Sequence, residues 1–317
     1  MGHLTRCLSL CQAFSEKGFL PQLFVHSNEQ IDVFLEGVEA KARPWFEQRR
    51  DLLKEIGKPD IVLIDSYVLD KEFYEQLSKT AALAIYIDDN MRLDYPQGIV
   101  VNGTIGAEKF AYPKKEGLIY LLGTQYTPLR KDFWTESESK IAEEVSSLLI
   151  TFGGSDLSAM AFKVAEALAK TLPQLKLKVI SNKGIQGKCL PGVDCIYELS
   201  AAGMRKAFEE ADIVISASGQ TLYELASLAR PTIGVLVADN QLHNAEGFKT
   251  AGFIEYAGSW LDESVLENIL LCLEKIYSYK ERCRRQDIAR SLIDGQGARR
   301  IAGFAYNLLE KCTAEKN

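Results

Sequence analysis

A histidine and an arginine stand three residues apart in the run Gly2-His3-Leu4-Thr5-Arg6, near the first residue of this 317-residue sequence. Helical periodicity over Leu4–Phe14 indicates that the run leads from a loop into a helix. The positive end of a helix dipole disfavours imidazolium, so we expect His3 to be neutral and able to take a proton from water as a general base. On these residues alone, a histidine that only caps the helix is an equally good interpretation.

Paired glycines follow an apolar run in the second half of the chain, where Leu148–Phe152 leads into Gly153, Gly154, Ser155 and Asp156. Glycines allow backbone N–H groups to approach a phosphate closely, and the dipole of the helix that follows favours its charge. The pattern therefore predicts a nucleotide phosphate site. An ordinary strand-to-helix turn is the alternative, because paired glycines alone are weak evidence.

A second loop of small residues follows the apolar run Asp212–Ala217. We expect Ser218, Gly219 and Thr221 to hold a diphosphate, and Glu224, one turn further along, to accept hydrogen bonds from both ribose hydroxyls. The alternative is a capped helix whose dipole Glu224 complements. Two loops of this kind in one half of the chain favour nucleotide binding.

Further polar residues follow other predicted strands. Asn240 and Gln241 follow Thr232–Val237 and offer amide donors to phosphate or sugar, although a polar turn is the better explanation when they are taken alone. In the first half, strand ends carry side chains suited to sugar hydroxyls and amides: Asp65, Tyr67, Asp88, Asp89 and Asn102. Structural capping is the alternative for each. No histidine accompanies Asp88-Asp89, so we predict no metal, and no residue pattern calls for a cofactor.

Short apolar runs alternate with amphipathic stretches along the whole chain, which predicts an α/β protein with parallel sheets covered on both faces. The strand candidates are Leu20–His26, Asp60–Asp65, Leu83–Asp88, Ile99–Asn102, Leu118–Leu122, Leu148–Phe152, Leu175–Ser181, Val193–Tyr197, Asp212–Ala217, Thr232–Val237 and Phe253–Tyr256. Besides Leu4–Phe14, the helix candidates are Ala159–Thr171, Gln220–Ser227 and Ser264–Tyr277.

A polar, acidic stretch separates the two sets of strands, which suggests two domains of ordinary size. The expected division is a first domain over 1–134, a linker over 135–145, a second domain over 146–285, and a helical segment over 286–317 that packs back on the first domain. A doubly wound domain normally opens with a strand before its first loop and helix. No such strand precedes Gly2 here, so the first strand of the N-terminal domain is apparently missing. Either the natural start lies upstream, which is the interpretation we favour, or the first sheet lacks a strand.

Composition excludes several classes of function. The formal net charge of −6 provides no broad basic field, so we expect no nucleic-acid partner. No apolar run reaches the roughly 18 residues of a membrane span and no signal peptide is evident, so we expect no stable membrane association and a cytoplasmic location. The seven cysteines include no C-x-x-C pair, and we expect buried thiols rather than disulfides or metal ligands.

Taken together, these motifs resemble the GT-B superfamily, and most closely its UDP-sugar hydrolases of the pseudaminic acid pathway and their relatives in spore-coat polysaccharide synthesis. The matching stretches span nearly the whole chain in the right order: 2–7, 64–67, 88–89, 123–133, 153–156, 216–218 with Glu224, 240–241 and 294–301. The second half also resembles the glycosyltransferase that adds N-acetylglucosamine to the peptidoglycan lipid precursor.

The resemblance implies two Rossmann-like doubly wound domains that face each other across a cleft. It also implies hydrolysis of a UDP-linked diacetamido-trideoxy sugar with inversion at the anomeric carbon, with His3 as the catalytic residue. Arg6, Asp65, Tyr67, Asn102, Tyr126 and Arg130 are then expected to bind the sugar. Two alternatives stay open, a glycosyltransferase that uses an acceptor alcohol instead of water and a non-catalytic binder of sugar nucleotides.

Overall fold

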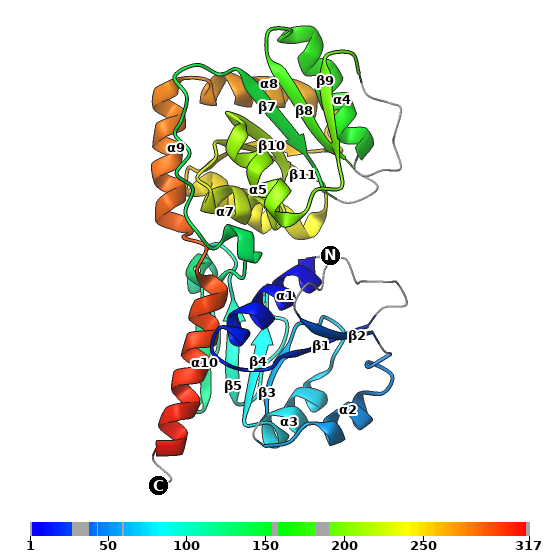
Figure 1. Cartoon of the computed structure of the whole chain (residues 1–317), viewed down its shortest axis with the longest axis vertical. Helices are drawn as coiled ribbons and strands as arrows, with labels where there is room; N and C mark the ends of the chain where they lie inside the picture. Colours follow the sequence, from blue (N-terminus) through cyan, green and yellow to red (C-terminus); the bar gives the residue numbers. More distant parts are fainter. Residues whose placement is uncertain are drawn as a thin grey trace. The chain divides into compact units, whose positions relative to one another are not determined.

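The computed structural model describes residues 2–26, 38–42, 44–58, 60–153, 158–181 and 190–314 of the chain. The chain divides into two compact units (Figure 1). The first consists of Met1–Lys131 with Gly295–Asn317, and the second consists of Asp132–Asp294. Residues 135–145, which the sequence predicts as a linker, lie within the second unit.

The first unit contains a four-stranded parallel sheet in the order β3-β4-β5-β6 and a separate parallel pair, β1 with β2. Its strands are β1 (Gln22–Val25), β2 (Glu39–Ala42), β3 (Ile61–Ile64), β4 (Leu83–Ile87), β5 (Gly98–Asn102) and β6 (Leu118–Leu122). Its α-helices are α1 (Gly2–Ser15), α2 (Arg49–Glu55), α3 (Lys71–Thr80) and α10 (Gly297–Ala314).

Helix α3 covers one face of the four-stranded sheet. The Asp70 carboxylate caps the helix by accepting a hydrogen bond from the backbone N–H of Phe73 at 2.9 Å. Phe73 and Leu77 then pack in one cluster with Tyr86 of β4 and Val100 of β5. Because side chains alternate along a strand, the intervening residues of β4 face the opposite side of the sheet.

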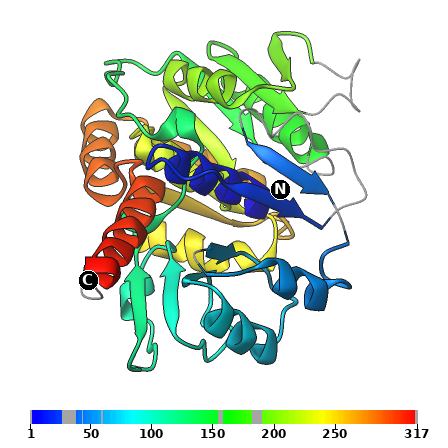
Figure 2. The same cartoon turned by 60° about the horizontal axis from the view of Figure 1, so that its bottom comes forward.

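The C-terminal helix α10 packs along α1 in the first unit (Figure 2). The Arg299 guanidinium donates two hydrogen bonds to the Glu16 carboxylate, at 2.7 and 2.9 Å. At the start of α10, Gly297 lies directly against the backbone of Thr127, where a Cβ atom would come within 2.6 Å of the Thr127 nitrogen. Only a glycine allows this approach, which joins the last helix to the segment that follows β6.

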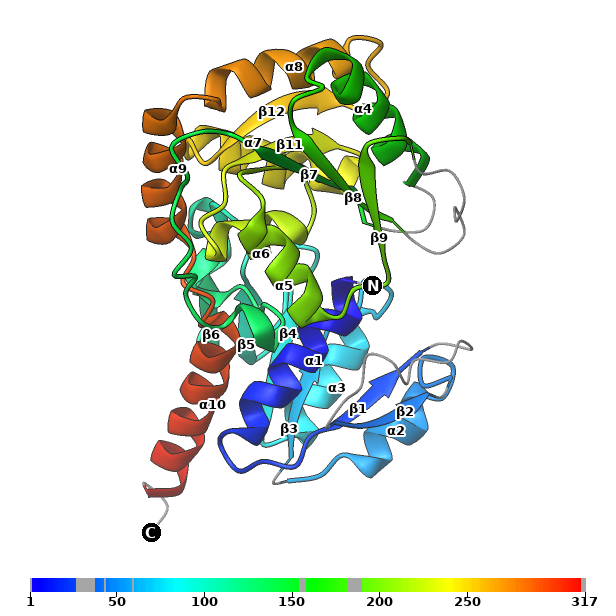
Figure 3. The same ribbon diagram turned by 45° about the horizontal axis from the view of Figure 1, so that its top comes forward.

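The second unit is a six-stranded, all-parallel sheet in the order β12-β11-β10-β7-β8-β9 (Figure 3). Its strands are β7 (Ser147–Thr151), β8 (Lys176–Ser181), β9 (Val193–Tyr197), β10 (Ile213–Ala217), β11 (Thr232–Leu236) and β12 (Ile254–Ser259). Its α-helices are α4 (Ser158–Thr171), α5 (Ala201–Glu210), α6 (Thr221–Ser227), α7 (Leu242–Thr250), α8 (Val265–Ile276) and α9 (Tyr279–Leu292).

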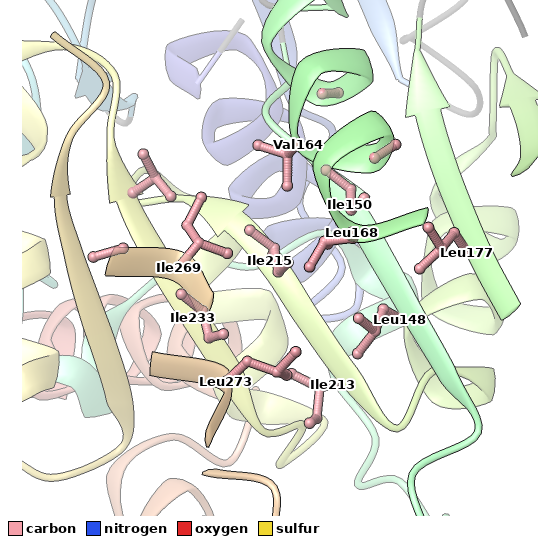
Figure 4. Packing of buried hydrophobic residues seen from close by; sticks show 14 of the residues in the cluster. Leu148, Ile150, Val164, Leu168, Leu177, Ile213, Ile215, Ile233, Ile269 and Leu273 are labelled. Atoms are coloured by element: carbon pink, nitrogen blue, oxygen red, sulfur yellow. The ribbon is translucent and has the colours of Figure 1, made fainter. Parts of the chain in front are cut away.

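Helices α4 and α8 cover the same face of the six-stranded sheet (Figure 4). The close-up labels side chains from both helices over side chains of the central strands: Val164, Leu168, Ile269, Leu273, Leu148, Ile150, Ile213, Ile215 and Ile233. Burial of such side chains stabilises the fold by about 1.5–3 kcal/mol each. The central strands β7, β10 and β11 are buried on both faces, which explains their mostly apolar sequences.

Three arginines of the second unit bind the backbone of the acidic segment that precedes β7. Arg205 donates to the carbonyl oxygens of 132, 135 and 136, Arg230 donates to that of Ser139, and Arg282 donates to those of 142 and 143. Guanidinium groups satisfy several carbonyl oxygens at once because their five N–H donors form a rigid fork. The segment is therefore held against the second unit along its length.

The predicted α/β architecture with parallel sheets is confirmed, and each predicted strand is present with ends that differ by at most three residues. Strand β2 was not predicted. Within the predicted helical segment over 286–317, residues 293–296 separate α9 from α10. The expectation of free thiols is wrong for Cys195, which is disulfide-bonded. None of the helices in the described part of the chain is long and apolar enough to cross a membrane.

Candidate active site

His3 and Arg6 lie one turn apart at the start of α1, so both side chains leave the helix on the same face. The carboxyl end of the neighbouring strand β3 supplies Asp65, whose side chain is only 1% exposed. The Nδ1 atom of His3 lies 2.6 Å from Oδ1 of Asp65. Arg6 donates to both oxygens of the same carboxylate, from Nη2 to Oδ1 at 2.7 Å and from Nε to Oδ2.

A second carboxylate, Asp89, follows the adjacent strand β4 and holds the other side of the arginine. Arg6 donates from Nη1 to Oδ1 of Asp89 at 2.8 Å and from Nη2 to Oδ2 at 3.0 Å. The Tyr67 hydroxyl also donates to Oδ2 of Asp89, and the tyrosine ring stands edge-on to the His3 imidazole with centroids 4.6 Å apart. We call these five residues the His3 cluster.

Contacts within the His3 cluster shift the pKa values of Asp65, Arg6 and Tyr67. Burial by itself raises the pKa of Asp65, but hydrogen bonds from Arg6 and His3 outweigh it and leave this pKa below its ordinary value. Burial likewise lowers the pKa of Arg6, yet Asp65 and Asp89 together raise it well above the ordinary value. Burial and the Asp89 carboxylate raise the pKa of Tyr67 to about 12, so its phenol is neutral. Asp65 is therefore an anion beside a fixed cation.

The hydrogen bonds of Asp65 determine which imidazole nitrogen of His3 carries the proton. A carboxylate only accepts hydrogen bonds, so the 2.6 Å contact requires the proton on Nδ1. The lone pair of the neutral ring then lies on Nε2, on a side chain that is 44% exposed. A histidine held in this way can accept a proton from water.

The structure places Asn102, which is expected to bind the sugar, within internal hydrogen bonds at the end of β5. Asn102 is fully buried, its Oδ1 accepts from the backbone N–H of Thr104 at 2.9 Å, and its Nδ2 donates to the Tyr112 hydroxyl at 3.0 Å. The same hydroxyl donates to Oδ2 of the buried Asp88 at 2.7 Å. Asn102 and Asp88 therefore form an internal polar network beneath the ends of β4 and β5.

Tyr126 and Arg130 lie beyond β6, at the other edge of the sheet from β3. The segment that contains them is fixed at several points. The Ser9 hydroxyl donates to the carbonyl oxygen of Leu129, and the Thr127 hydroxyl donates to that of Gly103 at 2.5 Å. The side chains of Tyr126 and Arg130 are partly exposed. They come from a different part of the unit than Asp65 and Asp89.

In the second unit, predicted nucleotide-binding residues follow three neighbouring strands, β7, β10 and β11. Gly219 after β10 and Gln241 after β11 are close together, because a Cβ atom on Gly219 would lie 3.3 Å from Nε2 of Gln241. The Oε1 atom of Gln241 accepts from the backbone N–H of Val237 at 3.4 Å. Asn240 beside it is exposed. The loops after β10 and β11 therefore form one surface.

The side chains of the β10 loop differ in their access to solvent. Thr221 is partly exposed, whereas Ser218 is fully buried and its hydroxyl has no hydrogen-bond partner among the described residues. The Glu224 side chain, in the first turn of α6, is also buried. After β7, Gly153 is exposed and has a positive φ of 64°. Gly154, Ser155 and Asp156 lie outside the described residues.

The sequence places Asp89 among the strand-end residues suited to a sugar, but the family resemblance does not include it among the residues expected to bind the sugar. Its position directly after β4, next in the sheet to β3, is the signal that could have included it, since the carboxyl ends of parallel neighbours lie at one edge. Within the described ranges, no three His, Cys, Asp or Glu side chains form a group that could hold a metal ion.

No family model matches the chain. Among curated proteins, it is 26% identical over 267 residues to the pseudaminic acid cytidylyltransferase and UDP-2,4-diacetamido-2,4,6-trideoxy-beta-L-altropyranose hydrolase of Helicobacter pylori, covering 80% of this chain and 45% of that protein. It is 24% identical to the spore coat polysaccharide biosynthesis protein SpsG of Bacillus subtilis, covering 98% of this chain and 95% of SpsG. The chain thus spans about half the length of the Helicobacter pylori relative and nearly all of SpsG.

Solved structures with the same architecture cover almost the whole chain. MurG of Acinetobacter baumannii matches with a TM-score of 0.65 at 15% identity, covering 96% of this chain and 95% of MurG. A calicheamicin glycosyltransferase matches with a TM-score of 0.64 at 14% identity, covering 96% and 94%. MnaA of S. aureus, solved with UDP, matches with a TM-score of 0.66 at 13% identity, covering 98% and 94%. The fold of this chain is therefore GT-B, with two Rossmann-like α/β domains.

Proposed function

We propose that this chain hydrolyses a UDP-linked diacetamido-trideoxy sugar at the anomeric carbon and releases UDP and the free sugar with inversion. The observation that carries the proposal is the pair formed by His3 and Asp65, whose side chains meet at 2.6 Å. A general base needs an oriented ring and an accessible lone pair, and this pair provides both.

In the proposed reaction, Nε2 of His3 takes a proton from a water molecule as the water oxygen bonds to the anomeric carbon. The bond between that carbon and the diphosphate oxygen breaks, and UDP leaves with the electron pair. Attack on the face opposite the leaving group inverts the anomeric centre. A nucleoside diphosphate is a good leaving group, so the reaction needs no second carboxylate of the kind that glycosidases use to protonate a leaving oxygen.

The second unit is proposed to bind the nucleotide. Gly153, Gly219 and Gln241 follow neighbouring parallel strands, the edge at which α/β sheets bind ligands. Backbone N–H groups of such loops stabilise the charge that develops on a departing diphosphate. Glu224 is proposed to accept hydrogen bonds from the ribose hydroxyls.

The choice of sugar comes from the relatives. The name of the Helicobacter pylori protein includes hydrolysis of a UDP-linked 2,4-diacetamido-2,4,6-trideoxy sugar, and SpsG is named for spore coat polysaccharide biosynthesis. The proposal transfers the first activity to this chain, which corresponds to less than half of that protein. A product for surface polysaccharide or nonulosonic acid synthesis follows from it.

The test is incubation of the purified chain with a panel of UDP-sugars that includes UDP-diacetamido-trideoxy sugars, UDP-N-acetylglucosamine and UDP-glucuronic acid. NMR would follow release of UDP and the anomeric configuration of the first free sugar formed. The expected result is release of inverted sugar from diacetamido substrates without any acceptor. Turnover only after an acceptor alcohol is added would instead identify a glycosyltransferase, and UDP-sugar binding without turnover would identify a binding protein.

A further inference from the structure

The guanidinium of Arg6 donates hydrogen bonds to two carboxylates of its own unit. Its side chain is only 13% exposed. Nε and Nη2 hold both oxygens of Asp65, and Nη1 and Nη2 hold both oxygens of Asp89. Each of two edges of the guanidinium therefore pairs with one carboxylate of the protein. A cation that binds substrate would instead direct its N–H groups toward the ligand.

We propose that Arg6 is a positioning residue that fixes the His3–Asp65 pair in one protonation pattern. It does not bind the sugar, in contrast to the role that the family resemblance implies for it. The activity part of this inference rests on the proposed function, whereas its structural part concerns the His3 ring alone.

The donor inventory of the guanidinium supports this assignment. Nη2 carries two hydrogens, and the two carboxylates accept both of them. The 3.2 Å separation between Nη2 of Arg6 and Nδ1 of His3 is therefore a contact between two donors that share Oδ1 of Asp65. Because Oδ1 of Asp65 only accepts hydrogen bonds, Nδ1 must carry the proton that it donates there, and Nε2 of the neutral ring then carries the lone pair.

Arg6 also fixes the direction of the Asp65 carboxylate. The Nε–Nη2 edge of the guanidinium grips both carboxylate oxygens, so the carboxylate plane cannot rotate away from the imidazole. Asp89 anchors the opposite edge of the arginine, and the Tyr67 hydroxyl binds Asp89 in turn. A lysine provides the charge but not the planar fork, so it cannot hold both carboxylates in this geometry.

The experiment compares the unchanged chain with Arg6→Lys by ¹⁵N NMR of the imidazole nitrogens. The sequence contains only three histidines, so His3→Asn assigns the His3 signals by loss. The matched control is Arg284→Lys, which breaks a two-bond fork to Glu281 on the surface of the second unit. The unchanged chain is expected to show His3 protonated on Nδ1 alone when its ring is neutral. Arg6→Lys is expected to show a mixture of the two tautomers, and Arg284→Lys to leave the His3 signals unchanged.

Steady-state kinetics on the UDP-sugar that is turned over provide the second readout. A positioning role predicts that Arg6→Lys lowers kcat by about 10–100-fold, as loss of an orienting partner does elsewhere, with KM changed less than about twofold. A rise in KM with kcat unchanged would make Arg6 a substrate ligand and overturn the proposal, and so would an unaltered His3 tautomer. If Arg6→Lys does not fold, the same readouts are applied to Asp89→Asn, which keeps the arginine and removes one of its two anchors.

The two proposals fail in different ways. If the unchanged chain releases no sugar from any UDP-sugar, the proposed function is wrong, and the tautomer of His3 in Arg6→Lys still decides the role of Arg6. If the chain is a hydrolase but the variant keeps both its tautomer and its kcat, only the inference about Arg6 is wrong.

Discussion

Nδ1 of His3 lies 2.6 Å from Oδ1 of Asp65, although the two residues are 62 positions apart in the sequence. The contact joins the first turn of α1 to the carboxyl end of β3 and leaves Nε2 as the nitrogen that can accept a proton. The predictions below test this pair, the proposed nucleotide loops and the packing that supports the first unit.

Replacement of His3 by asparagine should remove the proposed base. We expect His3→Asn to lower kcat by about 10²–10⁴, the usual contribution of a general base, and to leave UDP affinity unchanged because the proposed nucleotide residues belong to the other unit. The control is His26→Asn, because His26 is also 44% exposed and also lies near a carboxylate, Glu47, at 3.6 Å. Kinetics and UDP calorimetry check the prediction, and near-normal turnover by His3→Asn would rule out His3 as the base.

Acid should destabilise the first unit through Asp65. Burial raises the pKa of this carboxyl, but the hydrogen bonds from Arg6 and His3 outweigh burial and lower it. A lowered folded-state pKa stabilises the fold above the ordinary aspartate pKa of about 3.9, and this contribution is lost as pH falls through the lowered value. Asp65→Asn should therefore destabilise the chain at pH 7, by about 3 kcal/mol for a buried pair, and by progressively less below about pH 4.

Thermal unfolding between pH 7 and pH 2 measures this difference. The matched control is Asp51→Asn, since Asp51 pairs with Lys54 on the surface and the pair is well exposed. Exposed pairs contribute little, so this variant should match the unchanged chain at every pH. A destabilisation by Asp65→Asn that stays constant down to pH 2 would contradict the assignment of Asp65 as a stabilising anion.

Glu224→Gln should weaken UDP binding if Glu224 accepts hydrogen bonds from the ribose. Loss of hydrogen bonds to a charged acceptor costs about 1.5–3 kcal/mol, so the dissociation constant should rise by roughly 10–100-fold. Isothermal titration calorimetry with UDP measures it. Glu274→Gln serves as the control, because Glu274 is exposed on α8. Equal UDP affinity of Glu224→Gln and the unchanged chain would remove the ribose role.

Turnover should be independent of divalent metal ions. Two neighbouring aspartates could suggest a metal site, but both accept hydrogen bonds from other protein groups. Asp88 accepts one from Tyr112, and Asp89 accepts them from Arg6 and Tyr67. Backbone amides of the nucleotide loops are expected to stabilise the leaving diphosphate instead. The measurement is the hydrolysis rate with EDTA and with added Mg²⁺. Activity that disappears in EDTA and returns with Mg²⁺ would contradict this prediction.

Gly297→Ala should destabilise the first unit by about 1–3 kcal/mol, as overpacking does, because its Cβ atom would overlap the Thr127 backbone. Gly303→Ala in the same helix is the matched control, since the nearest atom to its Cβ would be the end of the Lys17 side chain at 3.9 Å. Alanine is the better helix former by about 1 kcal/mol, so Gly303→Ala should be neutral or stabilising. Equal denaturation midpoints for the two variants would contradict the close approach of α10 to Thr127.

The sequence alone was sufficient to predict the α/β architecture and the positions of most strands. Runs such as Leu148–Phe152 and Asp212–Ala217 are mostly apolar because both faces of the strand are buried, and this signal is local. The glycines that follow these runs, Gly153 and Gly219, likewise predict loops, because this signal also depends only on a few neighbouring residues. Strand β2, with the sequence Glu-Ala-Lys-Ala, is largely exposed and lacks an apolar pattern, which explains why it was not predicted.

Only the tertiary structure decided which polar side chains meet. Asp65, Asp89 and Asn102 all follow or end strands of one sheet and look equivalent in the sequence. The order of the strands and the direction of each side chain place Asp65 against His3 and Arg6, bring Asp89 to the other side of Arg6, and bury Asn102 beneath Tyr112. Hydrogen bonds form only within about 3 Å, and such distances between residues far apart in the chain depend on the packing of whole elements rather than on sequence spacing.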